Sequence, residues 1–305
     1  MIIAFIGENG FAREQSAKEF IAGFVSINGS TAVDKFIGES ADISQIIDAI
    51  STSPFLSPRR LVEIRDLSKN KLLAEHFEEI IKNVADTTEL VLIEDHIDGR
   101  SKFLTELKKF SEVREFANLE GEALTTWVVD QVQLMGGNIS HETSEVLIDR
   151  VGTNHQLLAN ELKKLVLYQP KITNMTVQLL TVYSPQSSIF AMLDAAFTGD
   201  VSKALKLYTE QRAQGMEPQA ILGMITWQLH SLAIVKSAGT LPVPEIASKS
   251  KISPFVIRKN LSNAKYISEQ KLVSLIKQAI TIDQKMKSIR INPDDAVQSL
   301  IIAFA

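Results

Sequence analysis

The hydrophobic pattern of this chain changes near residue 120. Before that point, short runs of apolar and β-branched residues alternate with segments long enough to form helices; the runs occupy residues 2–6, 32–37, 61–64, 90–93 and 113–116. This alternation is typical of a parallel sheet with crossover helices. Residues 90–93 are entirely apolar, and charged residues only bound the run, as expected for a strand buried on both faces. The sequence therefore predicts an α/β domain over residues 1–120.

Helical periodicity replaces the β pattern in the rest of the chain. Helices are expected at residues 122–135, 140–151 and 154–168, because glycine or proline follows each of them. They predict a small helical domain over residues 121–184. The segment at residues 184–188, Ser-Pro-Gln-Ser-Ser, interrupts two periodic runs and is expected to be a hinge. A third, all-α domain then spans residues 185–305, and several domains suit a chain of 305 residues.

Composition excludes several classes of function. The chain has no cysteine, which rules out disulfides, thiolate nucleophiles and cysteine-based zinc sites. A net charge of −4 argues against a protein that coats nucleic acid indiscriminately. Basic residues nevertheless outnumber acidic ones in residues 185–305, while acidic residues dominate residues 1–184. The basic third could face phosphates, acidic partner subunits or solvent alone.

The sequence predicts neither a membrane protein nor a catalytic centre. No run reaches the roughly 20 apolar residues of a membrane span, and the first residues turn polar too quickly for a signal peptide, so a cytoplasmic protein is expected. The five histidines show no metal-ligand spacing, and Trp127 and Trp227 lie in apolar helical contexts typical of core residues. We therefore expect no catalytic residue, no metal and no cofactor.

An α/β domain followed by a small helical domain is also the layout of the ATPases associated with diverse activities, or AAA+ proteins. A working P-loop needs glycines, a lysine for the phosphates and a hydroxyl for magnesium. After the first strand this chain has Gly-Glu-Asn-Gly-Phe-Ala-Arg-Glu at residues 7–14, without the Gly-Lys-Ser/Thr ending. Residues 90–95 do resemble a magnesium-binding strand end, but the lysine half is missing. The sequence argues against nucleotide hydrolysis by this chain.

Residues 189–236 carry the most specific pattern. By themselves they specify amphipathic helices, with Gly199 able to end one helix, Asp200 to cap the next and Pro218 to begin a third. Without further information, an anonymous helical bundle would explain them. The segment also resembles the collar domain of the delta-subunit family of the bacterial DNA polymerase III clamp loader, through Ile189-Phe190, Asp194-Ala195, Gly199-Asp200, Ala204-Leu205, Glu217-Pro218 and Gln228-Leu229.

Other segments share the resemblance, which covers most of the chain, is strongest in residues 150–290 and is weakest in the first 50. Residues 151–168 are similar to the family's second-domain signature, a Gly-x-Asn turn before a Leu-rich helix with Glu161 and Lys164. Residues 254–259 resemble its Pro-Phe-x-x-x-Lys turn, and Asp283 and Lys287 its final helix. The chain departs from the family at Ile289-Arg290, where a pair of small residues is common.

The resemblance implies a fold and a function. The fold would be an ATPase-like (AAA+-type) α/β domain without a working P-loop, a small helical domain and an α-helical collar. The function would be to bind and open the β sliding clamp for loading onto primed DNA, without ATPase activity in this chain. The implied partners are the β sliding clamp, the gamma/tau and delta-prime clamp-loader subunits and primed DNA in the complex, with ATP acting in the partner subunits.

The segment Ser-Pro-Phe-Leu-Ser-Pro at residues 53–58 is the candidate binding element. It places two large apolar residues between prolines, which stiffen a loop and lower the entropy lost on docking. In the delta family this connection carries a hydrophobic plug for a pocket on the clamp, and Pro54, Phe55 and Leu56 match that place. From the residues alone, burial of Phe55 or Leu56 in the core is the favoured interpretation, and the resemblance to the delta family reverses that preference.

Two other functions stay open from the sequence. One is an ATP-binding AAA+ ATPase of similar architecture, which the missing Gly-Lys-Ser/Thr disfavours. The other is an interaction module of replication or repair that binds DNA directly through residues 185–305, which a salt-dependent affinity for DNA would reveal.

Overall fold

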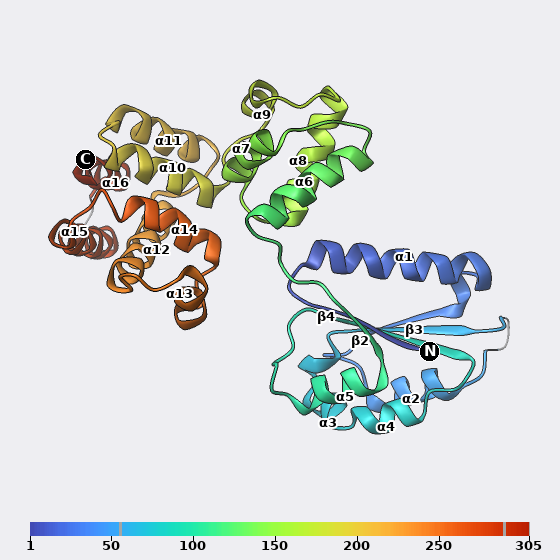
Figure 1. Cartoon of the computed structure of the whole chain (residues 1–305). Coiled ribbons are helices and arrows are strands. Elements are labelled where there is room, and N and C mark those ends of the chain that lie inside the picture. The colour runs from blue at the N-terminus through green and yellow to red at the C-terminus, as the bar shows by residue number, and fades with distance from the viewer. Residues whose placement is uncertain (55–56, 289–290, 305) are drawn as a thin grey trace. The chain divides into compact units, whose positions relative to one another are not determined.

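The computed structural model describes residues 1–54, 57–288 and 291–304. The chain divides into two compact units, Met1–Leu119 and Glu120–Ala305 (Figure 1). None of the described helices is long and apolar enough to cross a membrane.

The first unit is an α/β domain built on one parallel sheet. The sheet has five strands in the order β2-β3-β4-β1-β5. Its elements are β1 (Ile2–Ile6), α1 (Gly10–Asn28), η1 (Ser30–Ala32), β2 (Val33–Ile37), α2 (Ile43–Ser51), β3 (Arg60–Arg65), η2 (Leu67–Lys69), α3 (Lys71–Glu75), α4 (Phe77–Lys82), β4 (Thr88–Glu94), α5 (Lys102–Phe110) and β5 (Glu112–Glu115). The expected parallel sheet is confirmed, and each predicted strand overlaps an observed one.

Alternating side chains of the strands build two cores, one on each face of the sheet. Ile3 and Phe5 of β1 pack on the face covered by α1, together with Ala17 and Phe24 of that helix. The next residues along the strands, such as Ala4, point to the other face, where α2, α3, α4 and α5 contribute their buried residues (Figure 1). The period of two along each strand therefore explains why both faces are apolar and both are covered by helices.

The second unit is helical, as the sequence predicts. Its helices are α6 (Glu122–Leu134), α7 (His141–Val151), α8 (His155–Tyr168), α9 (Asn174–Leu180), α10 (Pro185–Phe197), α11 (Val201–Ala213), α12 (Pro218–Ser237), α13 (Val243–Ser250), α14 (Pro254–Asn263), α15 (Glu269–Ser288) and α16 (Pro293–Phe304). Short polar side chains cap many of them: Ser140, Asn154 and Asp200 each accept a hydrogen bond from a first-turn amide. Such caps stabilise a helix by about 1 kcal/mol each.

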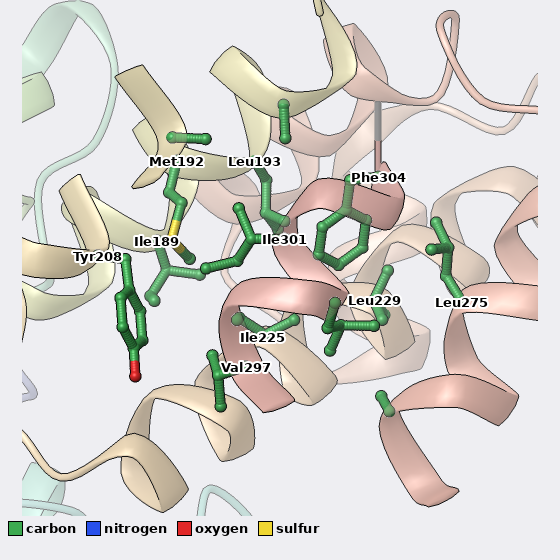
Figure 2. Packing of buried hydrophobic residues seen from close by; sticks show 14 of the residues in the cluster. Ile189, Met192, Leu193, Tyr208, Ile225, Leu229, Leu275, Val297, Ile301 and Phe304 are labelled. Carbon is green, nitrogen blue, oxygen red and sulfur yellow. The ribbon is translucent and has the colours of Figure 1, made fainter. Parts of the chain in front are cut away.

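One large apolar core joins five of these helices. Figure 2 shows Ile189, Met192 and Leu193 of α10, Tyr208 of α11, Ile225 and Leu229 of α12, Leu275 of α15, and Val297, Ile301 and Phe304 of α16 packed around a common centre. The C-terminal helix is part of this core, because Val297, Leu300 and Ile301 are at most 1% exposed. The core therefore links residues more than 100 positions apart in the sequence.

Helices α6 to α9 precede this core and pack mainly on one another. The change from α9 to α10 occurs at Ser184, whose side chain caps α10 and whose amide donates to Arg150 O. Pro185 occupies the first turn of α10, where a missing N–H costs nothing. A division into domains 1–120, 121–184 and 185–305 stays a prediction.

Candidate functional site

In a P-loop ATPase, nucleotide binds at the carboxyl end of the strand that precedes the P-loop. The corresponding position in this chain is the carboxyl end of β1, next to that of β4. The two strands are parallel neighbours, and Ile6 lies beside Glu94 in the register. Gly7 and Asp95, which follow these residues, therefore lie at the same edge of the sheet. Only residues 7–9 separate β1 from α1, because Asn9 caps the helix by accepting from the Ala12 amide at 3.1 Å. A loop this short cannot wrap a phosphate as a P-loop does.

Two of the three backbone amides in the loop at residues 7–9 donate to acceptors within the protein. The Gly7 amide donates to Glu94 O at 3.3 Å, and the Asn9 amide donates to Phe116 O at 3.0 Å. Gly7 itself has a φ of +122°, and any Cβ there would clash with the Phe116 carbonyl. Because a P-loop holds phosphate through free amides, this arrangement supports the expectation that the chain does not hydrolyse nucleotide.

Arg13 occupies the position of the P-loop lysine, counted from Gly7 in the pattern G-x-x-x-x-G-K-[ST]. It is 8% exposed, and its Nη1 donates to Gly7 O and, at 2.8 Å, to Asp95 Oδ1. Glu14 stands where the motif has its hydroxyl, and it pairs with Arg65 of β3 at 2.7 Å. The sequence analysis missed Arg13, although its spacing from Gly7 is a signal that could have found it.

Glu94, the acid at the end of β4, is engaged inside the unit. Its carboxylate is fully buried and accepts hydrogen bonds from the Leu67 amide at 2.7 Å and the Ser68 amide at 3.3 Å. Burial raises the pKa of Glu94, while the hydrogen bonds from Ser68 and Leu67 oppose this shift. Glu94 belongs to the strand end that resembles a magnesium site. In this structure its carboxylate instead accepts hydrogen bonds from the backbone of η2. Within the described residues, no cluster of His, Asp and Glu could hold a metal ion.

The loop between α2 and β3 contains the predicted clamp-binding residues. Pro54 is partly buried and follows α2, whereas Phe55 and Leu56 lie outside the described residues. On the far side of the loop, the Ser57 hydroxyl donates to Arg59 O at 2.8 Å. The structure therefore describes the residues on both sides of positions 55 and 56.

Arg60 fixes the base of this loop. Its Nη1 donates to Ala49 O at 3.1 Å and to Thr52 O at 3.4 Å, which ties the start of β3 to the last turn of α2. Its Nε lies 3.3 Å from the Asp34 carboxylate of β2. Because β3 begins at Arg60, the loop meets the sheet at the edge where the strands begin. The P-loop position lies at the opposite edge, where the strands end.

The residues that carry the family pattern in the helical unit are mostly structural. Asp194 of α10 accepts a hydrogen bond from Asn263 Nδ2 at 2.6 Å, and burial raises the pKa of the Asp194 carboxyl. Gln228 of α12 donates to the Oδ1 of Asn260, a fully buried residue of α14. These side chains therefore hold α10 and α12 to α14.

Helix α14 also carries two cations that pair with the first part of this unit. Lys259 Nζ lies 2.8 Å from Asp149 of α7, and Arg258 Nη2 lies 3.2 Å from Glu120. Lys259 is the lysine of the Pro-Phe-x-x-x-Lys turn. Its pairing gives that motif a structural role in joining α14 to α7.

The tryptophans differ in their surroundings. Trp127 is partly buried and its ring meets the His155 ring edge-on, with centroids 4.9 Å apart. Trp227 is 43% exposed, so the prediction that it is a core residue is wrong. It lines an apolar pocket of about 420 Å³ between α10 and α12, with Ile189, Gly223 and Met224. Its helical spacing placed it beside the core but could not show that its side chain stays exposed in the described part of the chain.

The histidines form no common site. His155 is 4% exposed, and burial lowers its pKa. His76 lies 3.2 Å from Glu79, and His96 lies 4.0 Å from Glu8. Among the described residues, these three histidines lie on separate helices and loops.

Comparison with known proteins places this chain in a family. Residues 4–117 match the family described as DNA polymerase III, delta subunit, and residues 186–304 match DNA polymerase III delta subunit, C-terminal domain. The chain is 26% identical over 266 residues to DNA polymerase III subunit delta of Bacillus subtilis, covering 82% of this chain and 77% of that protein.

A solved structure shows the same fold. The Bacillus subtilis DNA clamp loader delta protein YqeN superposes with a TM-score of 0.75 at 21% identity, covering 99% of this chain and 94% of that one. The likeness confirms the expected architecture, an α/β domain with a parallel sheet followed by helical regions. Because both family models and the B. subtilis relative match, the chain belongs to the family of DNA polymerase III delta subunits, which are subunits of the clamp loader.

Proposed function

We propose that this delta subunit binds the β sliding clamp through residues 54–56 and opens the ring for loading onto primed DNA. The observation that carries the proposal is the loop between α2 and β3. Two prolines stiffen it, two large apolar residues lie between them, and Arg60 fixes its base through Ala49 O and Thr52 O. A stiff loop on a fixed base loses little entropy on docking, which favours its use as a binding element.

Ring opening in this proposal is mechanical. A ligand that binds the open ring more tightly than the closed ring shifts the population toward the open form, and only by that difference in affinity. Moving a population from 1:99 to 99:1 requires about 5.5 kcal/mol of differential binding. An apolar plug docked in a clamp pocket could supply part of this difference, so this subunit needs no chemical step of its own.

Nucleotide acts elsewhere in the proposed complex. The strand edge where an AAA+ ATPase binds ATP is here occupied by Arg13, Asp95 and protein-bonded amides. We therefore assign ATP binding to the gamma/tau partner subunits, whose state would control access of this subunit to the clamp. The subunit itself would hold no cofactor, and the complex would work in the cytoplasm.

The helical collar offers surfaces for these partner subunits and for delta-prime. On α15, Leu272, Leu275 and Ala279 enter the core, whereas Val273 and Ile280 on another face of the helix are about half exposed. Trp227 is also exposed beside its apolar pocket. Apolar side chains on the outer faces of core helices suit association with the homologous domains of other subunits.

Binding to the purified sliding clamp of the same organism tests the proposed function. We expect the full chain to bind the clamp in the absence of ATP and the affinity to be unchanged by added Mg-ATP. A matched titration with primed DNA, without the clamp, tests the alternative of a DNA-binding module. If the chain binds DNA with a steep salt dependence and does not bind the clamp, the basic third is the functional surface and the proposal is wrong.

A further inference from the structure

Arg13 is a buried cation at the position where a P-loop places its phosphate-binding lysine. It lies in the P-loop lysine position on the first turns of α1, and it is more than nine-tenths buried. A guanidinium removed from water is stable only when a counter-charge and hydrogen-bond acceptors accompany it. In a working P-loop the phosphates of the nucleotide provide that counter-charge to the lysine.

In this chain a carboxylate provides the counter-charge. Asp95 follows β4 and places Oδ1 2.8 Å from Arg13 Nη1, which also donates to Gly7 O. Arg13 thereby joins the β1–α1 loop to the end of β4, two segments that a nucleotide bridges in an ATPase. The side chain of Asp95 is 60% exposed, so this carboxylate reaches the guanidinium from the solvent side.

We propose that the Asp95 carboxylate occupies the phosphate position of a former nucleotide site and so makes the α/β unit independent of nucleotide. Its pairing with Arg13 keeps the β1–α1 loop attached to β4 when no ligand is bound. The proposal also assigns a latent site to the unit: without the Asp95 carboxylate, Arg13 would accept a small inorganic anion such as phosphate.

Two further features define what this latent site would bind. The Nε of Arg13 is buried and donates to no acceptor within the described part of the chain, so the guanidinium has a donor to spare. Glu8 and Glu14 stand close to Arg13 in the sequence, and Glu14 is already paired with Arg65 at 2.7 Å. Their negative charge disfavours a triphosphate, so the expected ligand is inorganic phosphate at millimolar concentrations.

Thermal unfolding of the full chain with and without inorganic phosphate tests this inference. The variant Asp95→Ala removes the carboxylate, and Asp86→Ala is the matched control, because Asp86 is an exposed aspartate of the same unit. We expect Asp95→Ala to lower the unfolding midpoint of the α/β unit by about 2–4 °C relative to Asp86→Ala. Millimolar phosphate should restore most of this loss and leave the parent and Asp86→Ala unchanged.

A double variant identifies Arg13 as the group that binds phosphate. Asp95→Ala combined with Arg13→Ala removes the cation together with its counter-ion, so it should be at least as stable as Asp95→Ala alone and should not respond to phosphate. If Asp95→Ala is too unstable to purify, a double variant that folds supports the proposal, because it shows that the unpaired Arg13 cation causes the instability, and a double variant that is equally unstable contradicts it. Equal midpoints for Asp95→Ala and Asp86→Ala would overturn the proposal, as would equal stabilisation of all variants by phosphate.

Discussion

Tyr208 of α11 donates a hydrogen bond of 2.6 Å from its hydroxyl to Asp294 Oδ1, at the start of α16. Arg212 Nε donates to the same oxygen at 2.8 Å. Burial and the Asp294 carboxylate raise the pKa of Tyr208, while the hydrogen bonds from Tyr208 and Arg212 lower the pKa of Asp294. This contact anchors the first turn of the C-terminal helix, whose apolar face completes the core in Figure 2.

Replacing Tyr208 by phenylalanine should weaken this anchor. Tyr208 is 1% exposed, and the variant keeps its ring but removes the donor to Asp294. Because Arg212 still pairs with the carboxylate, we expect the free energy of unfolding to fall by about 1 kcal/mol. Chemical denaturation measures the loss. Tyr266→Phe is the control, since Tyr266 is 63% exposed, and equal stabilities of the two variants would show that the hydrogen bond contributes nothing.

The pH dependence of stability should reveal the cost of burying Asp194. Burial raises its folded-state pKa above the ordinary value for an aspartate, although the hydrogen bond from Asn263 and the charge of Lys259 oppose the shift. The folded state therefore holds this proton more tightly than the unfolded state. Asp194 consequently lowers stability as pH rises from about 3.8 through the folded pKa, and the cost then stays constant.

The variant Asp194→Asn should remove this cost and keep an oxygen that can accept from Asn263. Its stability relative to the parent should be higher at pH 7 than at pH 3.5, by the free energy that ionisation of Asp194 costs in the folded state. Denaturant titrations at the two pH values measure the difference. A relative stability that does not change between them would show that the Asp194 carboxyl titrates alike in the folded and unfolded states.

Calorimetry should detect no binding of Mg-ATP by this subunit. The amides of Gly7 and Asn9 donate to protein acceptors, and Arg13 is already paired with Asp95. With these two amides engaged and with neither a lysine nor a hydroxyl at residues 7–14, the loop lacks the groups by which a P-loop holds a triphosphate and its magnesium ion. A gamma/tau subunit measured under the same conditions is the positive control. A micromolar dissociation constant for Mg-ATP would contradict the conclusion that residues 7–14 do not bind nucleotide.

The sequence predicted the regular elements closely where burial dictates the pattern. The expected strands at residues 2–6 and 90–93 correspond to β1 and β4, because strands covered on both faces are apolar throughout. Helix α9 was not predicted. It has only seven residues, and its start rests on the capping box of Thr173 and Thr176 rather than on long apolar periodicity.

The functional residues were harder to predict, for a different physical reason. The ion pair of Arg13 and Asp95 joins positions 82 residues apart, so no local pattern contains it. A P-loop is recognised in a sequence by its lysine. Here an arginine, Arg13, stands at the lysine position, so the sequence pattern did not reveal it. Exposure of Trp227 was equally hidden, because helical spacing shows which face a residue is on but not which helices cover that face.

The variant with Phe55→Ala and Leu56→Ala tests the proposed clamp contact. Anchors buried in a partner pocket commonly cost 2 kcal/mol or more each when truncated, roughly a thirtyfold loss of affinity per residue. If these residues belonged to the core instead, loss of the phenylalanine alone would cost about 3–5 kcal/mol of stability. The control combines Ile37→Ala with Leu72→Ala, two apolar residues of the same unit that are 60% and 66% exposed.

The most direct measurement is the affinity of the Phe55→Ala, Leu56→Ala variant for the sliding clamp, taken together with its unfolding midpoint. The account predicts that the midpoint stays at the parent value while clamp binding falls below detection, and that the control variant binds as the parent does. A double variant that binds the clamp as tightly as the parent would contradict the account, and so would one that loses binding only because it unfolds.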